Sequence, residues 1–100
     1  MTPKEAKNAL AECRSQIDVV DRQIVELLNQ RTRIVEQIGR IKKQMEMPIY
    51  EPKREDEVFA NAIASSAGPL PPEAVKRIFE RIIDEMRMVQ RVRMETDGEK

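Results

Sequence analysis

The 100-residue sequence contains no histidine, one cysteine, three glycines, one tyrosine and two phenylalanines. The absence of histidine excludes Ser–His and Cys–His nucleophile pairs and histidine metal sites. The single cysteine, Cys13, excludes an internal disulfide and a metal site built from a cluster of cysteines. The scattered glycines exclude a phosphate-binding glycine-rich loop, and so few aromatic residues exclude a base-stacking platform. Most familiar catalytic chemistry is therefore excluded before any motif is considered.

The sequence also lacks net charge and long hydrophobic runs. Its 18 lysines and arginines balance 18 aspartates and glutamates, which gives no electrostatic reason to expect a nucleic acid or an anionic membrane as partner. The charged residues 1–8 contain no secretory signal, and no segment has the roughly 18 apolar residues of a membrane span. We therefore expect a cytoplasmic protein with one domain over residues 1–95, followed by a disordered polar tail over 96–100.

Three segments have apolar residues at helical spacing, and proline-containing connectors separate them. The first begins with a capping box at residues 2–5 and extends from about residue 3 to 45. A connector with two prolines leads to a short helix over about 52–63, and a second proline-rich loop leads to a third over about 72–94. The sequence predicts an all-α fold with a long, a short and a medium helix.

The apolar residues of the first segment alternate at spacings of three and four, which forms a heptad seam. The seam positions are Leu10, Cys13, Ile17, Val20, Ile24, Leu27, Arg31, Ile34, Ile38, Ile41 and Met45. Such a helix is about 64 Å long, whereas a compact chain of this size has a radius of gyration near 13 Å, on the order of one fifth of that length. We therefore expect a second molecule to cover the seam. A plain coiled coil satisfies the same pattern.

One seam position, Arg31, is a cation where the pattern predicts an apolar residue. A buried arginine needs an anion opposite it, although a register-setting polar residue is also typical of a seam. Arg14 and Lys42 lie within about 20° of the same stripe. Arg31 and Lys42 are about 16 Å apart along the helix and could bracket a small dianion, whereas Arg14 is about 25 Å from Arg31. If all three bind one ligand, Arg14 comes from a second chain.

The third segment has a polar residue, Gln90, where its apolar stripe predicts a hydrophobic one. That stripe consists of Val75, Ile78, Phe79, Ile82, Ile83, Met86 and Val89. A buried amide needs hydrogen-bond partners. Gln90 is therefore either a functional residue or the frayed end of the stripe, and the sequence pattern alone leaves both interpretations open.

The chain resembles the all-helical chorismate mutases, small three-helix proteins that form an intertwined homodimer with two active sites. The resemblance extends over about residues 6–93. It depends on five segments in order, namely RSQID at 14–18 with Asp21, LLNQR at 27–31, IGRIK at 38–42, PIYEPKRE at 48–55, and residues 82–90. Each segment is unspecific alone, but the ordered set at these spacings is specific.

The resemblance implies an isomerase that converts chorismate to prephenate in phenylalanine and tyrosine biosynthesis. This intramolecular Claisen rearrangement needs no cofactor, metal, nucleophile or proton transfer. By position, Arg31 and Arg14 from the second chain would bind the two carboxylates of chorismate. The catalytic residues would be Lys42 and Gln90, which donate to the ether oxygen, and Glu55, which accepts from the ring hydroxyl.

Three further residues are implied to bind substrate, namely Arg54, Glu51 and Met86. Some family members have aspartate at the position of Glu51, and at least one type has serine at that of Met86. Catalysis would come from clamping the flexible side chain of chorismate over the ring and from stabilising negative charge on the ether oxygen as its bond breaks.

Two other functions fit the same fold. An isochorismate-pyruvate lyase shares the fold and the cationic site and would release pyruvate from isochorismate. A non-catalytic dimerisation or regulatory module for another shikimate-pathway enzyme would show little turnover by itself. The presence of every cationic position favours an enzyme.

Overall fold

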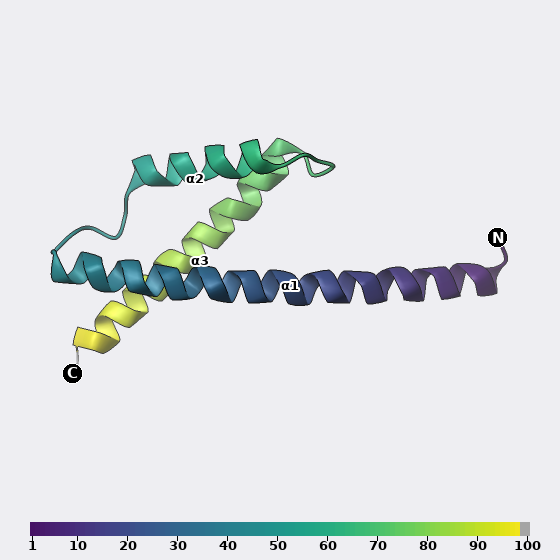
Figure 1. Ribbon diagram of the computed structural model, residues 1–100, viewed down its shortest axis with the longest axis horizontal. Helices are drawn as coiled ribbons and strands as arrows, with labels where there is room; N and C mark the ends of the chain where they lie inside the picture. Colours follow the sequence, from purple (N-terminus) through teal and green to yellow (C-terminus); the bar gives the residue numbers. More distant parts are fainter. Residues whose placement is uncertain (99–100) are drawn as a thin grey trace. The chain divides into compact units, whose positions relative to one another are not determined.

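The computed structural model describes residues 1–98, with side chains described up to Arg93. Every regular element in this range is a helix: α1 spans Pro3–Gln44, α2 spans Pro52–Ser65 and α3 spans Pro72–Gly98 (Figure 1). The predicted all-α fold with a long, a short and a medium helix is confirmed. The tail expected over 96–100 remains a prediction, because α3 continues to Gly98 and residues 99–100 lie outside the described range.

Local signals at the N-terminus start α1 where the sequence predicts. The backbone N–H of Glu5 donates to Oγ1 of Thr2 at 3.1 Å, and the same hydroxyl donates to Oε1 of Glu5 at 2.9 Å. The Thr2 side chain therefore satisfies one of the helix's unpaired N–H groups, and Pro3 has no N–H to satisfy. The same logic applies to α2 and α3, each of which begins at a proline.

The C-terminal end of α1 forms a turn that the sequence pattern does not indicate. Glu46 has a φ of 53°, a left-handed conformation that glycine usually occupies at this position. The N–H of Met47 donates to the carbonyl of Lys42 at 2.8 Å, and the N–H of Glu46 donates to that of Lys43 at 3.3 Å. These two bonds are the pattern of a Schellman motif, which ends the helix before the proline-containing connector begins.

The chain divides into two compact units, Met1–Arg33 and Ile34–Lys100. In the second unit α2 packs against α3, and a short loop joins the two (Figure 1). The last turns of α1 contact α3 through a hydrogen bond from Gln90 to Val35 and an ion pair between Arg93 and Glu36. The buried hydrophobic residues are Val35, Val75, Ile83 and Met86.

Most of the apolar stripe predicted for α3 faces this core, and Val75, Ile83 and Met86 are buried. Ile78 is the exception, because its side chain is 48% exposed. In α2, Val58 and Phe59 are half-buried. The hydrophobic periodicity of α3 therefore identifies its packed face, with Ile78 left exposed in the single chain.

The seam of α1 remains exposed within the chain. Its isoleucine, leucine, valine and methionine side chains are between 40% and 68% exposed, and Cys13 is also exposed. The α1 residues that contact α3, Val35 and Gly39, lie beside the seam and not on it. Among the described residues, no helix has the length and hydrophobicity needed to cross a membrane.

Candidate active site

Lys42 anchors the connector between α1 and α2. Its Nζ lies 2.7 Å from Oε1 of Glu51 and donates to the carbonyl of Ile49 at 3.1 Å, and its side chain is only 12% exposed. Its own backbone carbonyl accepts the N–H of Met47. Glu51 occupies the N-cap position of α2 but makes no side-chain capping bond, because its carboxylate turns to Lys42. The ammonium group is therefore fixed by two partners before any ligand binds.

Gln90 is buried at the contact between α3 and α1. Its side chain is 8% exposed, and its Nε2 donates to the carbonyl of Val35 at 3.2 Å. A Cβ added at Gly39 would lie 3.6 Å from the Cγ of Gln90, so the glutamine side chain packs directly on this glycine. Of the two interpretations of Gln90, the frayed end of the stripe is wrong, since the amide is buried and hydrogen-bonded.

Lys42 and Gln90 lie at the same face of α1. Gln90 contacts Gly39, and Lys42 follows Gly39 by three residues, which places the two on one side of the helix. An ammonium group has three N–H donors and a side-chain amide has two. In the described contacts Lys42 uses two of its donors and Gln90 one, so each has a further N–H group for a ligand.

Glu55 lies in the first turn of α2 and contacts a residue that the sequence pattern does not single out. Its Oε2 is 2.5 Å from Nη2 of Arg87 on α3. The guanidinium of Arg87 also lies 5.1 Å from the ring centroid of Tyr50 in the connector and 3.6 Å from Asp84. Arg87 follows the buried Met86 directly, and a charged residue beside an apolar stripe is usually a solvated one. Its partner in α2 is 32 residues away, so no local signal indicates the pair.

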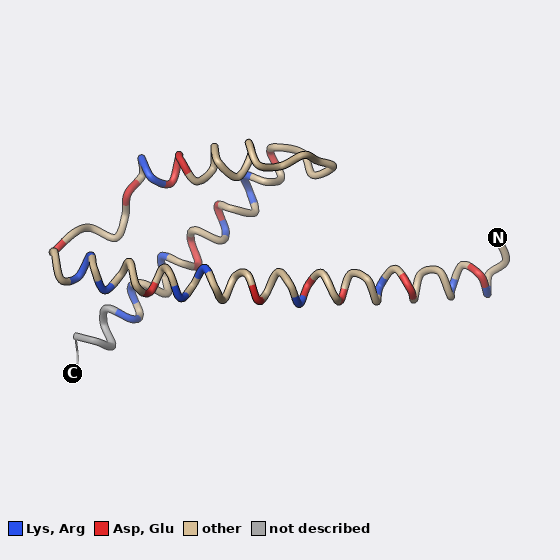
Figure 2. The backbone as a smooth tube through the Cα atoms, in the orientation of Figure 1, with Lys and Arg blue, Asp and Glu red and all other residues tan. Residues whose placement is uncertain are grey.

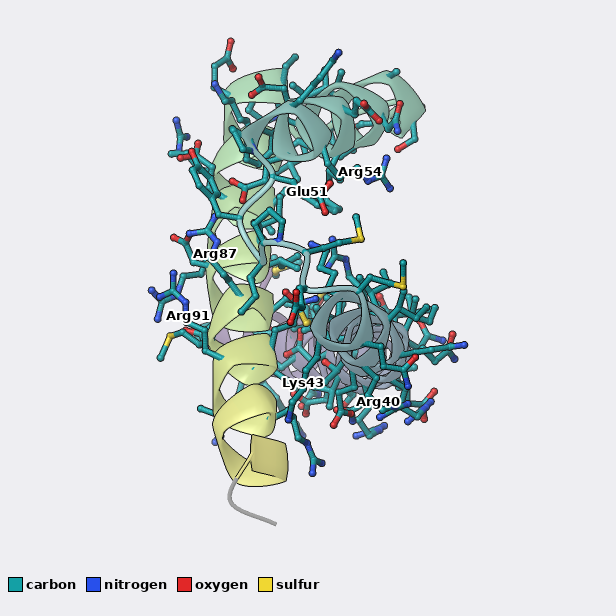
Figure 3. All side chains as sticks on the ribbon, turned by 90° about the vertical axis from the view of Figure 1, so that its left-hand side faces the viewer. Arg40, Lys43, Glu51, Arg54, Arg87 and Arg91 are labelled. Atoms are coloured by element: carbon teal, nitrogen blue, oxygen red, sulfur yellow. The ribbon has the colours of Figure 1, made fainter. Side chains whose placement is uncertain are left out.

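The other predicted residues differ in their exposure and contacts. Arg54 is exposed and pairs with Glu57 along α2 at 3.2 Å (Figure 3). Met86 is part of the buried core, one turn before Gln90. Arg14 and Arg31 belong to the first unit, where Arg14 is exposed and Arg31 is half-buried. The described contacts among the site residues include Lys42 with Glu51, Gln90 with the end of α1, and Glu55 with Arg87.

Lysine and arginine are interspersed with aspartate and glutamate along the helices, whereas residues 58–72 carry no charged side chain (Figure 2). Within the described residues, no group of three or more cysteine, aspartate or glutamate side chains is arranged to hold a metal ion. Lys42, near the end of α1, is instead matched by a single carboxylate, that of Glu51. Such a site suits an organic anion that can exchange with this carboxylate.

A hollow of about 240 Å³ lies between α2 and α3. It is lined by Glu55, Phe59, Lys76, Glu80, Ile83 and Asp84. Its lining includes Glu55 but neither Lys42 nor Gln90. The hydrogen-bonding side chains, and not this hollow, define the candidate site.

A family model described as "Chorismate mutase type II" matches residues 13–91. The chain belongs to this family. The match includes every position proposed for the site, from Arg14 to Gln90. The predicted family resemblance is confirmed.

Relatives and solved structures of chorismate mutases agree with this assignment. The bifunctional chorismate mutase/prephenate dehydratase of Aquifex aeolicus (strain VF5) is 37% identical over 78 residues, which cover 74% of this chain and 22% of that protein. The chain thus spans about a fifth of the length of the bifunctional relatives that it matches.

Two solved chorismate mutases share the fold. Form II of the Thermus thermophilus protein has a TM-score of 0.80 and 34% identity, with 83% of this chain and 94% of that chain covered. The Helicobacter pylori protein in complex with prephenate has a TM-score of 0.82 and 28% identity, with coverage of 88% and 96%. The predicted all-helical chorismate mutase fold is therefore confirmed.

Proposed function

We propose that this chain is a chorismate mutase that isomerises chorismate to prephenate in phenylalanine and tyrosine biosynthesis. The observation that carries the proposal is the family match over residues 13–91, which contains all the residues assigned to the site. The Helicobacter pylori relative, which shares the fold and was solved in complex with prephenate, supports this product. The reaction needs no nucleophile, so it suits a chain without histidine.

Lys42 and Gln90 stabilise the transition state by donating to the ether oxygen of chorismate. Negative charge grows on this oxygen as the carbon–oxygen bond breaks, and donors that are already in place need no reorganisation. A 10⁶-fold acceleration corresponds to about 8 kcal/mol, and one such donor contributes roughly 3–4 kcal/mol. The ion pair and hydrogen bonds that hold the two donors support this role.

The remaining residues bind the rest of the substrate. Glu55 accepts a hydrogen bond from the ring hydroxyl, and Glu51 lies beside Lys42. Arg54 and Met86 are assigned to the pocket by the family resemblance alone, because Arg54 pairs with Glu57 and Met86 packs in the core. In the absence of substrate Glu51 balances the charge of Lys42, and the substrate carboxylates bring further negative charge to the site. Holding the flexible enolpyruvyl side chain over the ring supplies the rest of the rate enhancement.

We also propose that the enzyme is a homodimer in which Arg14 of one chain and Arg31 of the other bind the two substrate carboxylates. The exposed seam of α1 supports this assembly, because nine apolar seam residues are at least 40% exposed in the single chain. A second copy offers the same heptad pattern in return, which is the self-complementary contact of a two-fold dimer. Cytoplasmic localisation remains a prediction.

The direct test follows the consumption of chorismate by its ultraviolet absorbance and identifies the product. We expect prephenate, and we expect Arg31→Ala to abolish most of the turnover because it removes a carboxylate-binding cation. Arg33→Ala is the matched control, since Arg33 is exposed two residues further along α1. A folded dimer without turnover of chorismate would contradict the proposal. Release of pyruvate from isochorismate by that protein would favour the lyase instead.

A further inference from the structure

Arg87 connects three segments of the second unit. From α3 its guanidinium reaches Glu55 in the first turn of α2 at 2.5 Å and lies 5.1 Å from the ring of Tyr50 in the connector. The side chain is 23% exposed and that of Glu55 is 21% exposed. Both members of the pair are thus largely withdrawn from water, where an ion pair is screened less than at the surface.

We propose that Arg87 is a positioning residue for the reaction, which holds the Glu55 carboxylate in the orientation that accepts the ring hydroxyl of the substrate. This inference rests on the proposed mutase function. Arg87 binds Oε2 of Glu55, and no described hydrogen bond in the side chains up to Arg93 uses Oε1. One carboxylate oxygen is therefore fixed by the protein while the other is left to accept from substrate.

Arg54, the cation next to Glu55 in the sequence, does not hold it. Arg54 precedes Glu55 in the sequence but pairs with Glu57 on the exposed side of α2. The second carboxylate near Arg87, that of Asp84, is 3.6 Å away and 57% exposed, so it contributes less than the shorter and more buried pair with Glu55. Among these contacts, orientation of Glu55 depends on Arg87.

The contact with Tyr50 extends the same role to the connector. Tyr50 immediately precedes Glu51, which pairs with Lys42. A planar guanidinium can stack on an aromatic ring and donate in its own plane at the same time, which an ammonium group cannot do. Arg87 therefore fixes Glu55 directly and steadies the segment that carries Glu51.

A double-mutant cycle on kcat distinguishes positioning from general stabilisation. The variants are Arg87→Met, Glu55→Gln and the double substitution, with Arg91→Met as matched control because Arg91 is an exposed arginine one turn further along α3 (Figure 3). We expect Arg87→Met to lower kcat about tenfold with a smaller change in KM, and to change kcat less than about twofold in the Glu55→Gln background. Arg91→Met leaves kcat within about twofold of the wild type.

Arg87→Lys provides a second comparison, because it keeps the positive charge but not the planar guanidinium. Lysine keeps the charge that pairs with Glu55, so we expect its kcat to lie closer to the wild type than that of Arg87→Met. Equal losses in both substitutions, or the same tenfold loss with and without the Glu55 carboxylate, would overturn the inference. Arg87→Gln takes the place of Arg87→Met in the cycle if the methionine variant does not fold.

Failure of this inference is distinguishable from failure of the proposed function. If the wild type converts chorismate and Glu55→Gln is impaired, additive effects overturn only the role of Arg87. If the wild type does not convert chorismate, the proposed function itself fails and the inference fails with it.

Discussion

The two compact units of the chain differ in how their apolar side chains are covered. In Met1–Arg33, helix α1 leaves the seam residues Leu10, Ile17, Val20, Ile24 and Leu27 about half exposed. In Ile34–Lys100, segments of three helices bury Val35, Val75, Ile83 and Met86 around a small core. Even there, none of the side chains described is less than 2% exposed.

This difference separates local from tertiary causes of structure. The first unit is helical because its cap, its composition and the absence of internal proline favour a helix. An isolated helix is marginal in water, however, and its stability in a protein comes mainly from packing an apolar face. The second unit has such packing within the chain. The apolar seam of the first unit is exposed in the single chain and needs a partner to cover it.

The prediction with the largest expected effect tests whether a second copy of the chain covers this seam. Val20 and Val19 are neighbouring valines that are 51% and 46% exposed, but only Val20 lies on the seam. In a single chain, glutamate at either position would be harmless. In a two-fold dimer Val20→Glu buries two charges, each costing several kcal/mol, so we expect the dissociation constant to rise by more than about 10³-fold.

Sedimentation velocity measures the oligomeric state of the two variants, and a chorismate assay measures their activity. Val20→Glu should be monomeric and inactive, while Val19→Glu should remain dimeric and active. Equal behaviour of the two variants would show that the seam is not the dimer contact.

The second prediction concerns the catalytic role of Lys42, which belongs to the second unit. Lys42→Ala removes an ammonium group that donates to the transition state, so we expect kcat to fall about 10²–10³-fold with a smaller change in KM. Lys43→Ala changes a neighbouring, exposed lysine and should leave kcat within about twofold. Steady-state kinetics of both variants check this, and an equal rise in KM at constant kcat would refute the role of Lys42.

The same division between local and tertiary causes explains which features of the structure the sequence predicts and which it does not. Helix starts depend on nearby prolines and the Thr2 cap, and all three are predicted correctly. The turn at Glu46 is not predicted, because a non-glycine residue adopts the left-handed conformation there. The exposure of Ile78 and the omission of Arg87 have a tertiary cause, since helical periodicity does not say how far a neighbouring helix extends.

The candidate site shows this limit most clearly. The sequence pattern places Lys42 near the stripe of Arg31 and marks Gln90 as a polar residue at an apolar position. It does not identify their partners, because Ile49, Glu51 and Val35 are brought to them by the turn at the end of α1 and the packing of α3. Periodicity assigns residues to a face of a helix. It does not assign the contacts that one face makes with another.

The prediction with the smallest expected effect concerns Gly39, which lies at the contact between α1 and α3. A Cβ at Gly39 would lie 3.6 Å from the Cγ of Gln90, an ordinary van der Waals distance, so Gly39→Ala has room. Alanine favours a helix interior over glycine by about 0.8–1.0 kcal/mol, and we expect a free energy of unfolding higher by roughly that amount.

Gly68→Ala is the matched control, for which we expect the opposite change in the free energy of unfolding. Nothing lies within 4 Å of a Cβ at Gly68, but its φ of +85° is strained for alanine, so we expect destabilisation by about 1 kcal/mol. Thermal and urea unfolding of both variants measure whether the free energy of unfolding rises or falls. A loss of stability in Gly39→Ala would mean that the glutamine cannot yield even slightly, and Gly39 would then be required for the close approach of α3 and not merely tolerated in α1.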